Sequence, residues 1–274
     1  MKNKKTLLLL PLIALTTIIT FFSCQKEAAS LPEDAAIPAG QSQLQVMLTD
    51  DPSQIFDSIF IDIKKLEVKI KDSAGNERWD TLSIRAGVYN ILRFRNGLDT
   101  LLAIGNIPNG ELKKIRVTLG TNNYVMLKGV QIPLNLNSSD AVITIDVNGS
   151  VDRIGVRRFR IWLDFDGHGS IRNKSNGRLE LKLKLSHFCN SNSGEIEGEI
   201  KPSAALPATV TVIAGTDTLT AIPDREGEFK IRGIKTTTAT IIIKPSNGYK
   251  DSVINNVIIR RGDDTDLGKI VLHR

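Results

Sequence analysis

Runs in which apolar and polar residues alternate fill the chain after residue 42. Clear examples are residues 44–48, 159–166 and 179–185. A period of two places successive side chains on opposite faces of a β-strand, and no stretch keeps the 3.6-residue period of an amphipathic helix. The pattern predicts an all-β chain, and many short strands separated by turns favour two antiparallel β-sandwich domains in tandem. Residues 179–185 should form the strand with the cleanest single buried face.

Local features refine this expectation. The apolar positions of residues 59–70 change parity at Lys64-Lys65, which predicts a β-bulge because a one-residue shift would otherwise exchange the two faces. Residues 72–76 have the composition of a hairpin turn. Another turn is expected at Gly110, where glycine would supply a positive φ. Residues 89–95 fit either a strand or one helical turn.

The first 24 residues follow a different pattern. Three lysines precede an uncharged apolar run at residues 7–22, and Ser23-Cys24 follow. A basic start and an apolar core of this length are typical of a secretory signal peptide, here residues 1–23. A membrane-spanning helix needs about 20 apolar residues, so an uncleaved membrane anchor is the weaker alternative.

Residues 21–24, Phe-Phe-Ser-Cys, resemble a bacterial lipobox. The resemblance implies that the Cys24 sulfur carries a diacylglycerol, and several acyl chains hold a protein on a membrane more firmly than one. Gln25-Lys26-Glu27 resembles the short charged signal that places lipoproteins of some Gram-negative bacteria on the cell surface. We therefore expect an outer-membrane lipoprotein exposed at the cell surface, with a periplasm-facing body as the alternative. Residues 24–42 would be the lipidated cysteine and a flexible tether.

Charge and cysteine content narrow the function further. The net charge is +6, from 36 basic and 30 acidic residues. Three of the lysines belong to the leader, so the rest of the chain carries only +3, and aromatic residues make up 5%. Nucleic acid is not an expected partner, since no basic run is interleaved with aromatics. Cys24 and Cys189 are the only cysteines, so lipidation of Cys24 leaves no pair for an intramolecular disulfide.

A series of short motifs in a fixed order marks the first predicted domain, residues 43–188. The motifs are Leu44-x-Val46-x-Leu48-Thr49-Asp50-x-Pro52, Asn96-Gly97, Ile107-Pro108-x-Gly110, Ile115-Arg116 and Leu163-Asp164-Phe165-Asp166. With them this part of the chain resembles an exported bacterial domain of unknown function, the family numbered 4382. That resemblance implies an exported location and a fold, and it carries no activity.

A second series of motifs follows a polar linker at residues 189–194. These motifs are Ile196-x-Gly198-x-Ile200, Val210-x-Val212, Asp224-x-x-Gly227-x-Phe229, Gly233-Ile234, Gly248-Tyr249 and Asp266-Leu267-Gly268-x-Ile270. Residues 195–274 thereby resemble a carboxypeptidase regulatory-like domain. The resemblance implies a small transthyretin-like sandwich, a fold shared with some carbohydrate-binding modules, and a structural or interactive role without catalysis. In it, Gly227 would take a positive φ and Phe229 would enter the core.

The residues Asp164-Phe165-Asp166-Gly167 are the sharpest candidate for chemistry. Calcium prefers oxygen ligands, and Asp50 could join Asp164 and Asp166 if two strand ends meet. The loop lacks the third spaced acid and the terminal glutamate of an EF-hand. The simpler interpretation is that Phe165 fills the core while the aspartates cap a glycine-rich turn. Calcium is the one cofactor that these residues suggest.

Catalysis has little support in the sequence. His187 and Cys189 lie on one strand face, as a thiol nucleophile and its base could, but an unpaired cysteine is more often a small buried residue. The chain contains no H-E-x-x-H, G-x-S-x-G or P-loop motif. We therefore expect no enzyme.

Three aromatic residues are candidates for glycan contact. Trp79, Trp162 and Tyr124 could form a platform for a sugar, and burial in the core or on a strand face is the alternative. We expect a lipid-anchored protein that binds or scaffolds a partner, either a glycan or a surface protein, without catalysis. Two alternatives are a carbohydrate-binding lipoprotein that presents glycans to partner enzymes and a calcium-dependent adhesion module.

Overall fold

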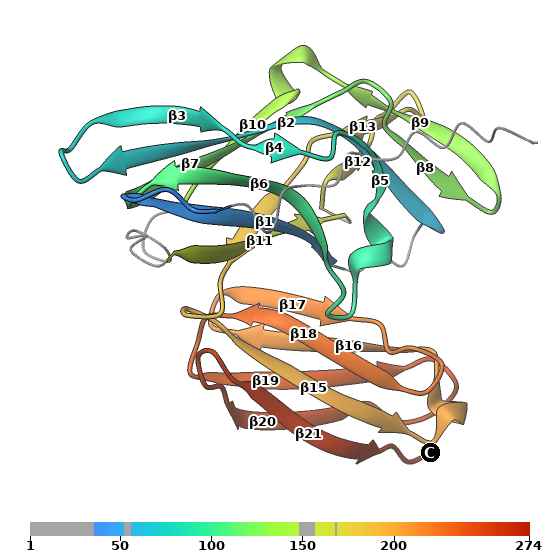
Figure 1. The fold of residues 1–274 in the computed structure, drawn as a ribbon. Helices are drawn as coiled ribbons and strands as arrows, with labels where there is room; N and C mark the ends of the chain where they lie inside the picture. Colours follow the sequence, from blue (N-terminus) through green and yellow to red (C-terminus); the bar gives the residue numbers. More distant parts are fainter. Residues whose placement is uncertain (1–35, 52–55, 148–156, 168) are drawn as a thin grey trace, which may run out of the picture. The chain divides into compact units, whose positions relative to one another are not determined.

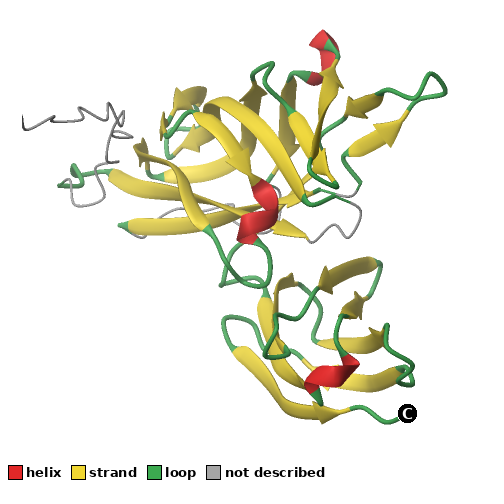
Figure 2. Cartoon of the chain, turned by 90° about the vertical axis from the view of Figure 1, so that its right-hand side faces the viewer, coloured by secondary structure: helices red, strands yellow, loops and turns green. Residues whose placement is uncertain are grey.

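The alternating runs form β-strands in the computed structural model, which describes residues 36–51, 56–147, 157–167 and 169–274 (Figure 1). No α-helix occurs among these residues. Turns and loops connect the strands, together with the short 3₁₀ helices η1 (Ile91–Phe94), η2 (Ser138–Asp140) and η3 (Ser203–Ala205) (Figure 2). The predicted all-β fold class is confirmed. The signal peptide, Cys24, most of the tether and His168 lie outside the described residues.

Strands from the first part of the chain build a five-stranded sheet with β1 at its centre. The strand order is β14-β11-β1-β6-β4. Leu44, Val46 and Leu48 of β1 are fully buried, as the alternation predicts. The strands are β1 (Gln41–Asp51), β4 (Ser83–Ile84), β6 (Thr100–Pro108), β11 (Arg158–Asp166) and β14 (Leu185–Phe188).

A parallel strand pair lies inside this sheet, where the sequence predicts antiparallel pairing. β1 runs parallel to β11, with register from Gln43 opposite Arg158 to Asp51 opposite Asp166. β6 and β14 complete the neighbouring pairs in antiparallel fashion. Alternation along a strand sets which face is buried but not the direction of its neighbour, so the sequence pattern leaves this pairing undetermined.

A nine-stranded sheet packs over the same core. Its main path is β10-β7-β2-β8-β9-β13-β12, and β3 and β5 also pair with β2. The two sheets enclose a cluster that includes Leu44, Ile61, Val117 and Phe165. The strands are β2 (Ser58–Asp72), β3 (Glu77–Thr81), β5 (Gly87–Asn90), β7 (Gly110–Leu119), β8 (Tyr124–Leu127), β9 (Val130–Leu136), β10 (Val142–Asp146), β12 (Ile171–Asn173) and β13 (Leu179–Leu181).

The predicted bulge and hairpin are both present in β2. The register with β7 shifts between Ile63 and Lys65, so the parity change at Lys64-Lys65 is absorbed without exposing apolar residues. The backbone turns at residues 72–76 and returns as β3. Residues 89–95 combine both predicted alternatives, since the end of β5 leads directly into η1.

Two sequence predictions are wrong in detail. Residues 179–185 do not form one strand: β13 pairs with β9 and β12, whereas β14 pairs with β11 of the other sheet. The leucines at the start of this run therefore belong to one sheet, and Leu185 at its end belongs to the other. Gly110 has no positive φ. Its need for glycine is steric, because a Cβ there would lie 2.1 Å from the Lys71 carbonyl oxygen.

Strands β15 to β21 form a seven-stranded sandwich, called here the C-terminal sandwich. Its sheets have the orders β18-β15-β21 and β17-β16-β19-β20. They enclose a second core that includes Ile196, Val210, Phe229 and Ile241. The strands are β15 (Gly194–Lys201), β16 (Ala208–Ala214), β17 (Asp217–Ala221), β18 (Glu228–Ile234), β19 (Thr238–Pro245), β20 (Ser252–Ile258) and β21 (Asp264–Val271).

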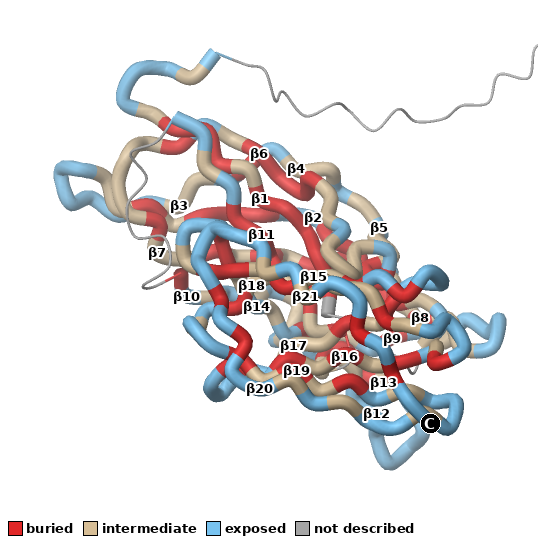
Figure 3. The backbone as a smooth tube through the Cα atoms, turned by 90° about the horizontal axis from the view of Figure 1, so that it is seen from below, coloured by how far each residue is buried: buried red, intermediate tan, exposed pale blue. Residues whose placement is uncertain are grey.

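The turn before β18 matches its prediction. Gly227 has φ +95, and a Cβ on it would meet the Ile200 carbonyl oxygen at 2.3 Å. Asp224 Oδ1 accepts hydrogen bonds from three successive backbone N–H groups, those of residues 226, 227 and 228. Phe229 then enters the core. Alternate residues of β16 and β19 are buried, whereas β20 and β21 are mostly exposed (Figure 3).

Candidate functional site

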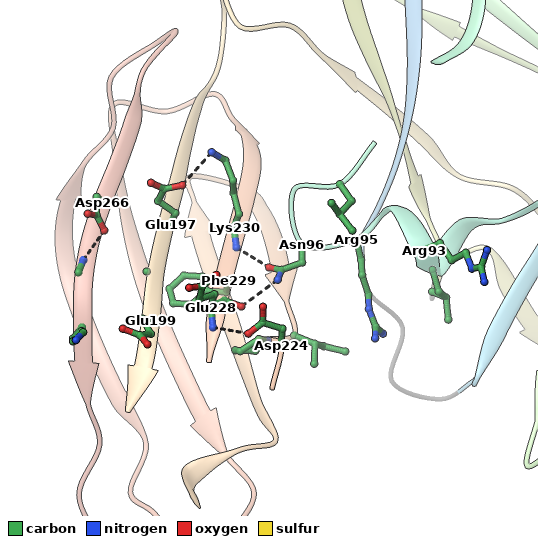
Figure 4. Close-up of a pocket in the computed structure, with 17 residues that line it drawn as sticks. Arg93, Arg95, Asn96, Glu197, Glu199, Asp224, Glu228, Phe229, Lys230 and Asp266 are labelled. Atoms are coloured by element: carbon green, nitrogen blue, oxygen red, sulfur yellow. Dashed lines mark hydrogen bonds and ion pairs between the residues drawn. The ribbon is translucent and has the colours of Figure 1, made fainter. Parts of the chain in front are cut away.

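A groove of about 890 Å³ lies between η1 with its following turn and the outer face of the sheet β18-β15-β21 (Figure 4). All the residues that line it belong to one compact unit, Leu31–Arg274. One wall consists of Leu92, Arg93, Arg95, Asn96 and Leu98, and the other of Glu197, Gly198, Glu199, Ile222, Pro223, Asp224, Glu228, Phe229, Lys230, Asp266, Gly268 and Lys269.

The η1 wall is held in place from both ends. Ile91 and Leu92 are buried in the first core, which fixes the helix. Asn96 and Gly97 then take left-handed conformations, with φ +59 and +79, and turn the chain toward β18. Asparagine and glycine are the residues that adopt this conformation most readily.

Asn96 attaches the turn to the backbone of β18. Its Oδ1 accepts a hydrogen bond from the Lys230 N–H at 2.7 Å, and its Nδ2 donates to the Glu228 carbonyl at 3.1 Å. One carboxamide thus satisfies a donor and an acceptor of an edge strand, as a neighbouring strand would. Close packing accompanies this contact, since a Cβ on Gly97 would lie 2.9 Å from the Lys230 side chain.

Lys230 joins three carboxylates on the sheet beneath the groove. Its Nζ lies 3.0 Å from Asp264 and 3.1 Å from both Glu195 and Glu197. Burial alone would lower the pKa of Lys230, but the hydrogen bonds that its ammonium donates to Asp264, Glu195 and Glu197 outweigh burial and raise the pKa above its usual range. The lysine is therefore a fixed cation in the sheet.

A second polar chain joins β11 to the C-terminal sandwich. The Trp162 indole N–H donates to Asp99 at 2.7 Å, and Arg232 donates to the same carboxylate at 2.9 Å and to Glu195 at 3.2 Å. Trp162 is only 5% exposed and stacks on Phe188 at 5.5 Å. This glycan candidate is therefore packed inside the protein.

The other two aromatic candidates are half-buried on the nine-stranded sheet. The guanidinium of Arg116 covers the Trp79 ring at 4.0 Å and also binds Glu67 at 2.9 Å. Tyr124 stacks on Phe60 at 4.5 Å. Among the described residues no ring contact joins Trp79, Trp162 and Tyr124, and glycan contact by these residues stays a prediction.

The strand ends that carry the three aspartates do meet. In the parallel pair, Asp50 lies opposite Phe165, and Asp164 lies opposite Thr49. Paired residues share a face and successive residues alternate, so Asp50 faces the core side while Asp164 and Asp166 face the other. Asp50 is accordingly 5% exposed.

Asp164 and Asp166 have protein partners. The Ser186 hydroxyl donates to Asp164 at 3.3 Å, and the Gly169 N–H donates to Asp166 at 2.6 Å, which is the predicted turn cap. No group of three His, Cys, Asp or Glu side chains in the described ranges is arranged to hold a metal ion. A calcium site at Asp50, Asp164 and Asp166 stays a prediction.

Cys189 is buried, and His187 beside it is half-buried. Cys189 is 1% exposed, and its Sγ lies 3.1 Å from the Ser191 hydroxyl oxygen. Burial, together with the charge of Lys235, lowers the pKa of His187 to about 4. The imidazole is neutral at pH 7 and a weak base, whereas a general base works best with a pKa near the operating pH.

The groove residues were not identified from the sequence. Asn96-Gly97 was visible as a turn, but its hydrogen bonds reach residues 132 and 134 positions away. A carboxamide in a turn carries no signal of such a distant partner. Arg93 and Arg95 on either side of Phe94 were the only available hint of a charged wall.

The family of the chain follows from comparison with known proteins. The family model described as "Domain of unknown function (DUF4382)" matches residues 41–183, just over half of the chain. The chain therefore belongs to this family, which agrees with the motifs of its first part. No curated protein matches the chain. The carboxypeptidase regulatory-like resemblance of residues 195–274 stays a prediction.

Several solved structures show weak similarity. A chain of a type II cohesin–X-dockerin complex from Acetivibrio cellulolyticus is 27% identical with a TM-score of 0.24, over 29% of this chain and 56% of that one. The TIE protein of Bacillus anthracis is 11% identical with a TM-score of 0.22, over 85% and 34% of the two chains. Shaft pilin SpaA of Lactobacillus rhamnosus GG is 9% identical with a TM-score of 0.22, over 85% and 96%.

These similarities carry no argument about function, because the TM-scores are too low. The chain also spans only about half and a third of the first two proteins. Within the described part of the chain, no helix is long and apolar enough to cross a membrane.

Proposed function

We propose that the protein is a lipid-anchored outer-membrane lipoprotein, exposed at the cell surface, that binds or scaffolds a partner without catalysis. The groove carries the binding part of this proposal. It is open, has a volume of about 890 Å³ and is lined by charged side chains, and its η1 wall is held by the Asn96 hydrogen bonds. Concave sites with a few well-placed polar groups are where proteins usually bind ligands.

Three observations support the absence of catalysis. The low pKa of His187, about 4, makes this residue a poor general base for Cys189. Cys189 itself is buried, and a reactive thiol needs access and a stabilised thiolate. The groove wall offers arginine, lysine and carboxylate groups, which can bind, and contains no cysteine, serine or histidine.

The anchor part of the proposal rests on the lipobox resemblance at Cys24. Lipidation can be tested by growth with a labelled fatty acid, and surface exposure by treating intact cells with protease. We expect the wild-type protein to incorporate label and to be cleaved on intact cells. Cys24→Ala should lose both the label and the membrane association. A Cys24→Ala protein that stays membrane-bound would contradict the anchor.

A calcium-dependent adhesion module is a second candidate, which rests on Asp164 and Asp166, because these two side chains share a strand face whereas Asp50 lies on the opposite one. Calorimetric titration with calcium of the wild type and of Asp164→Ala/Asp166→Ala separates the two ideas. Heat that disappears in the double variant would support calcium binding. Absence of heat in the wild type would reject it.

A further inference from the structure

The carboxylates of the groove are almost all engaged by groups of the protein itself. Glu197 pairs with Lys230 at 3.1 Å, and Glu199 pairs with Lys201 at 2.5 Å. Asp266 accepts the Gly268 N–H at 2.7 Å.

The same holds for Asp224, which caps its own turn with three hydrogen bonds. Glu228 differs, because no hydrogen bond or ion pair engages its carboxylate within the described residues, although its backbone binds Asn96. One of the five acidic side chains in the groove is therefore left to meet a ligand.

Most cations of the groove, unlike its carboxylates, have no partner within the described part of the protein. Lys230 is taken up by three carboxylates. Arg93, Arg95 and Lys269 also line the groove, and in the described part of the chain their head groups form no ion pair or hydrogen bond. Counting residues alone makes the groove slightly acidic, but the charged side chains that lack a protein partner within the described residues are three cations and one carboxylate.

We propose that this groove binds an acidic glycan, a polysaccharide that bears uronic acid carboxylates. The planar guanidinium group of Arg95 matches a carboxylate through paired hydrogen bonds, and Arg93 adds a second positive charge to the same wall. Glu228 would accept hydrogen bonds from sugar hydroxyls. An acidic peptide fits less well, because its side chains bring carboxylates and no hydroxyls to the Glu228 side.

The groove also offers apolar surface and an open path. Leu98 is 61% exposed beside the arginines, and the C–H face of a pyranose ring can pack on such a side chain. An open groove accommodates a chain that extends in both directions, whereas a small ligand is usually enclosed. Figure 4 places Arg95 and Asn96 on one wall, with Glu199 and Glu228 on the facing strands.

The backbone that carries the arginines is held in place before a ligand binds. η1 is anchored by the buried Ile91 and Leu92, and the turn that follows is bound to β18 by Asn96. A wall that is fixed before binding loses little conformational entropy when the ligand arrives.

The test is a titration of the full-length protein with oligogalacturonate, followed by calorimetry, with neutral dextran as the comparison. We expect oligogalacturonate to bind and dextran not to bind. Arg93→Ala/Arg95→Ala should weaken binding at least tenfold, and added salt should weaken binding to the wild type because the contacts are ionic. Arg93→Ala alone, which removes an exposed side chain, should give a smaller loss and guards against misfolding of the double variant.

Arg260→Ala/Arg261→Ala is the matched control. It removes the same two charges from the exposed turn between β20 and β21, away from the groove-lining residues. It should change the affinity less than twofold. Equal losses in both double variants would mean nonspecific charge attraction and would overturn the site.

Two other results would also overturn the proposal: no binding of oligogalacturonate to the wild type, or tighter binding of poly-glutamate than of oligogalacturonate. The inference rests on the proposed binding function. Failure here together with intact, Cys24-dependent surface exposure would reject the acidic glycan and leave the lipoprotein assignment standing. Loss of surface exposure with intact oligogalacturonate binding would reject the lipoprotein assignment and leave the acidic glycan standing.

Discussion

The two edge strands of the sheet β18-β15-β21 are protected in different ways. On β18, the Asn96 carboxamide occupies the backbone groups of Glu228 and Lys230. On β21, the register with β15 shifts opposite Glu197 and Glu199, where Gly268 takes φ +61. An edge with free backbone groups is a template for pairing with another chain, and a bulge disrupts that template.

The two edges are protected by residues that lie at different distances along the sequence. A bulge at Gly268 is built from residues adjacent in sequence, so it forms with the strand itself. The cap on β18 needs a residue more than 130 positions away, so it exists only when η1 and β18 are both in place. The β18 edge therefore reports on the integrity of the groove, and the β21 edge does not.

The largest expected effect is a difference in stability between substitutions in the two edge strands. Phe229 of β18 is buried, whereas Val271 of β21 is 58% exposed. Phe229→Ala should lower the free energy of unfolding by about 3–5 kcal/mol. Val271→Ala should change it by no more than about 0.5 kcal/mol. Guanidinium unfolding of both variants measures this, and similar losses would mean that β21 is packed in solution.

The next effect concerns the cap on β18. Asn96→Ala removes two hydrogen bonds and should cost about 1–3 kcal/mol. Hydrogen exchange should accelerate at the Lys230 amide, which loses its acceptor. Asn96→Gly retains the left-handed backbone and removes only the carboxamide, so it should show the same accelerated exchange. Unchanged exchange at Lys230 in both variants would contradict the cap.

The bulge on β21 should respond to a change of backbone preference alone. A Cβ on Gly268 meets nothing within 4 Å, so Gly268→Ala introduces only the strain of a positive φ, about 1–2 kcal/mol. Gly87→Ala is the control, because its Cβ also meets nothing and its φ is not positive. Thermal unfolding should show a lower Tm for Gly268→Ala only, and equal Tm values would place Gly268 in another conformation.

The smallest expected effect is a change of Tm with pH that depends on His187, which lies in β14 at the edge of the five-stranded sheet. The folded-state pKa of about 4 lies below the unfolded value of 6.5, so between these two values the unfolded chain binds more protons. Stability from this group is full above about pH 6.5 and is lost as the pH falls toward 4. We expect the Tm of wild type to fall more between pH 7.5 and 5 than the Tm of His187→Asn. Parallel pH profiles would show that His187 is accessible to protons in the folded protein.

Features set by neighbouring residues could be predicted from the sequence. The parity change at Lys64-Lys65, the hairpin after Asp72 and the positive φ of Gly227 depend on a few adjacent side chains and on steric limits of the backbone. The pairing of β1 with β11 could not be predicted, because alternation says nothing about which distant strand lies alongside. Residues 179–185 were mistaken for one strand for the same reason.

Trp162 shows how a residue on the outer face of one sheet can still be buried. Alternation places Trp162 on the face opposite Leu163, and it leaves open whether that face meets solvent or a further part of the protein. In the structure Met47, Leu101, Trp162 and Phe188 form a further apolar cluster there. The groove could not be predicted from the sequence. Which of its charged side chains have a partner within the protein depends on contacts between distant residues, and these appear only in three dimensions.

The parallel pair β1–β11 also has a mechanical consequence. The chain enters β1 at Gln41 and leaves β11 at Asp166, and the two strands are in register over nine residue pairs. A force that pulls the N-terminal end of β1 away from the C-terminal end of the chain slides these strands past each other. The hydrogen bonds across the pair then share the load together, whereas an antiparallel hairpin pulled at its open end loses them one at a time. The centre of this sheet is thus built to resist tension along the direction in which the chain runs.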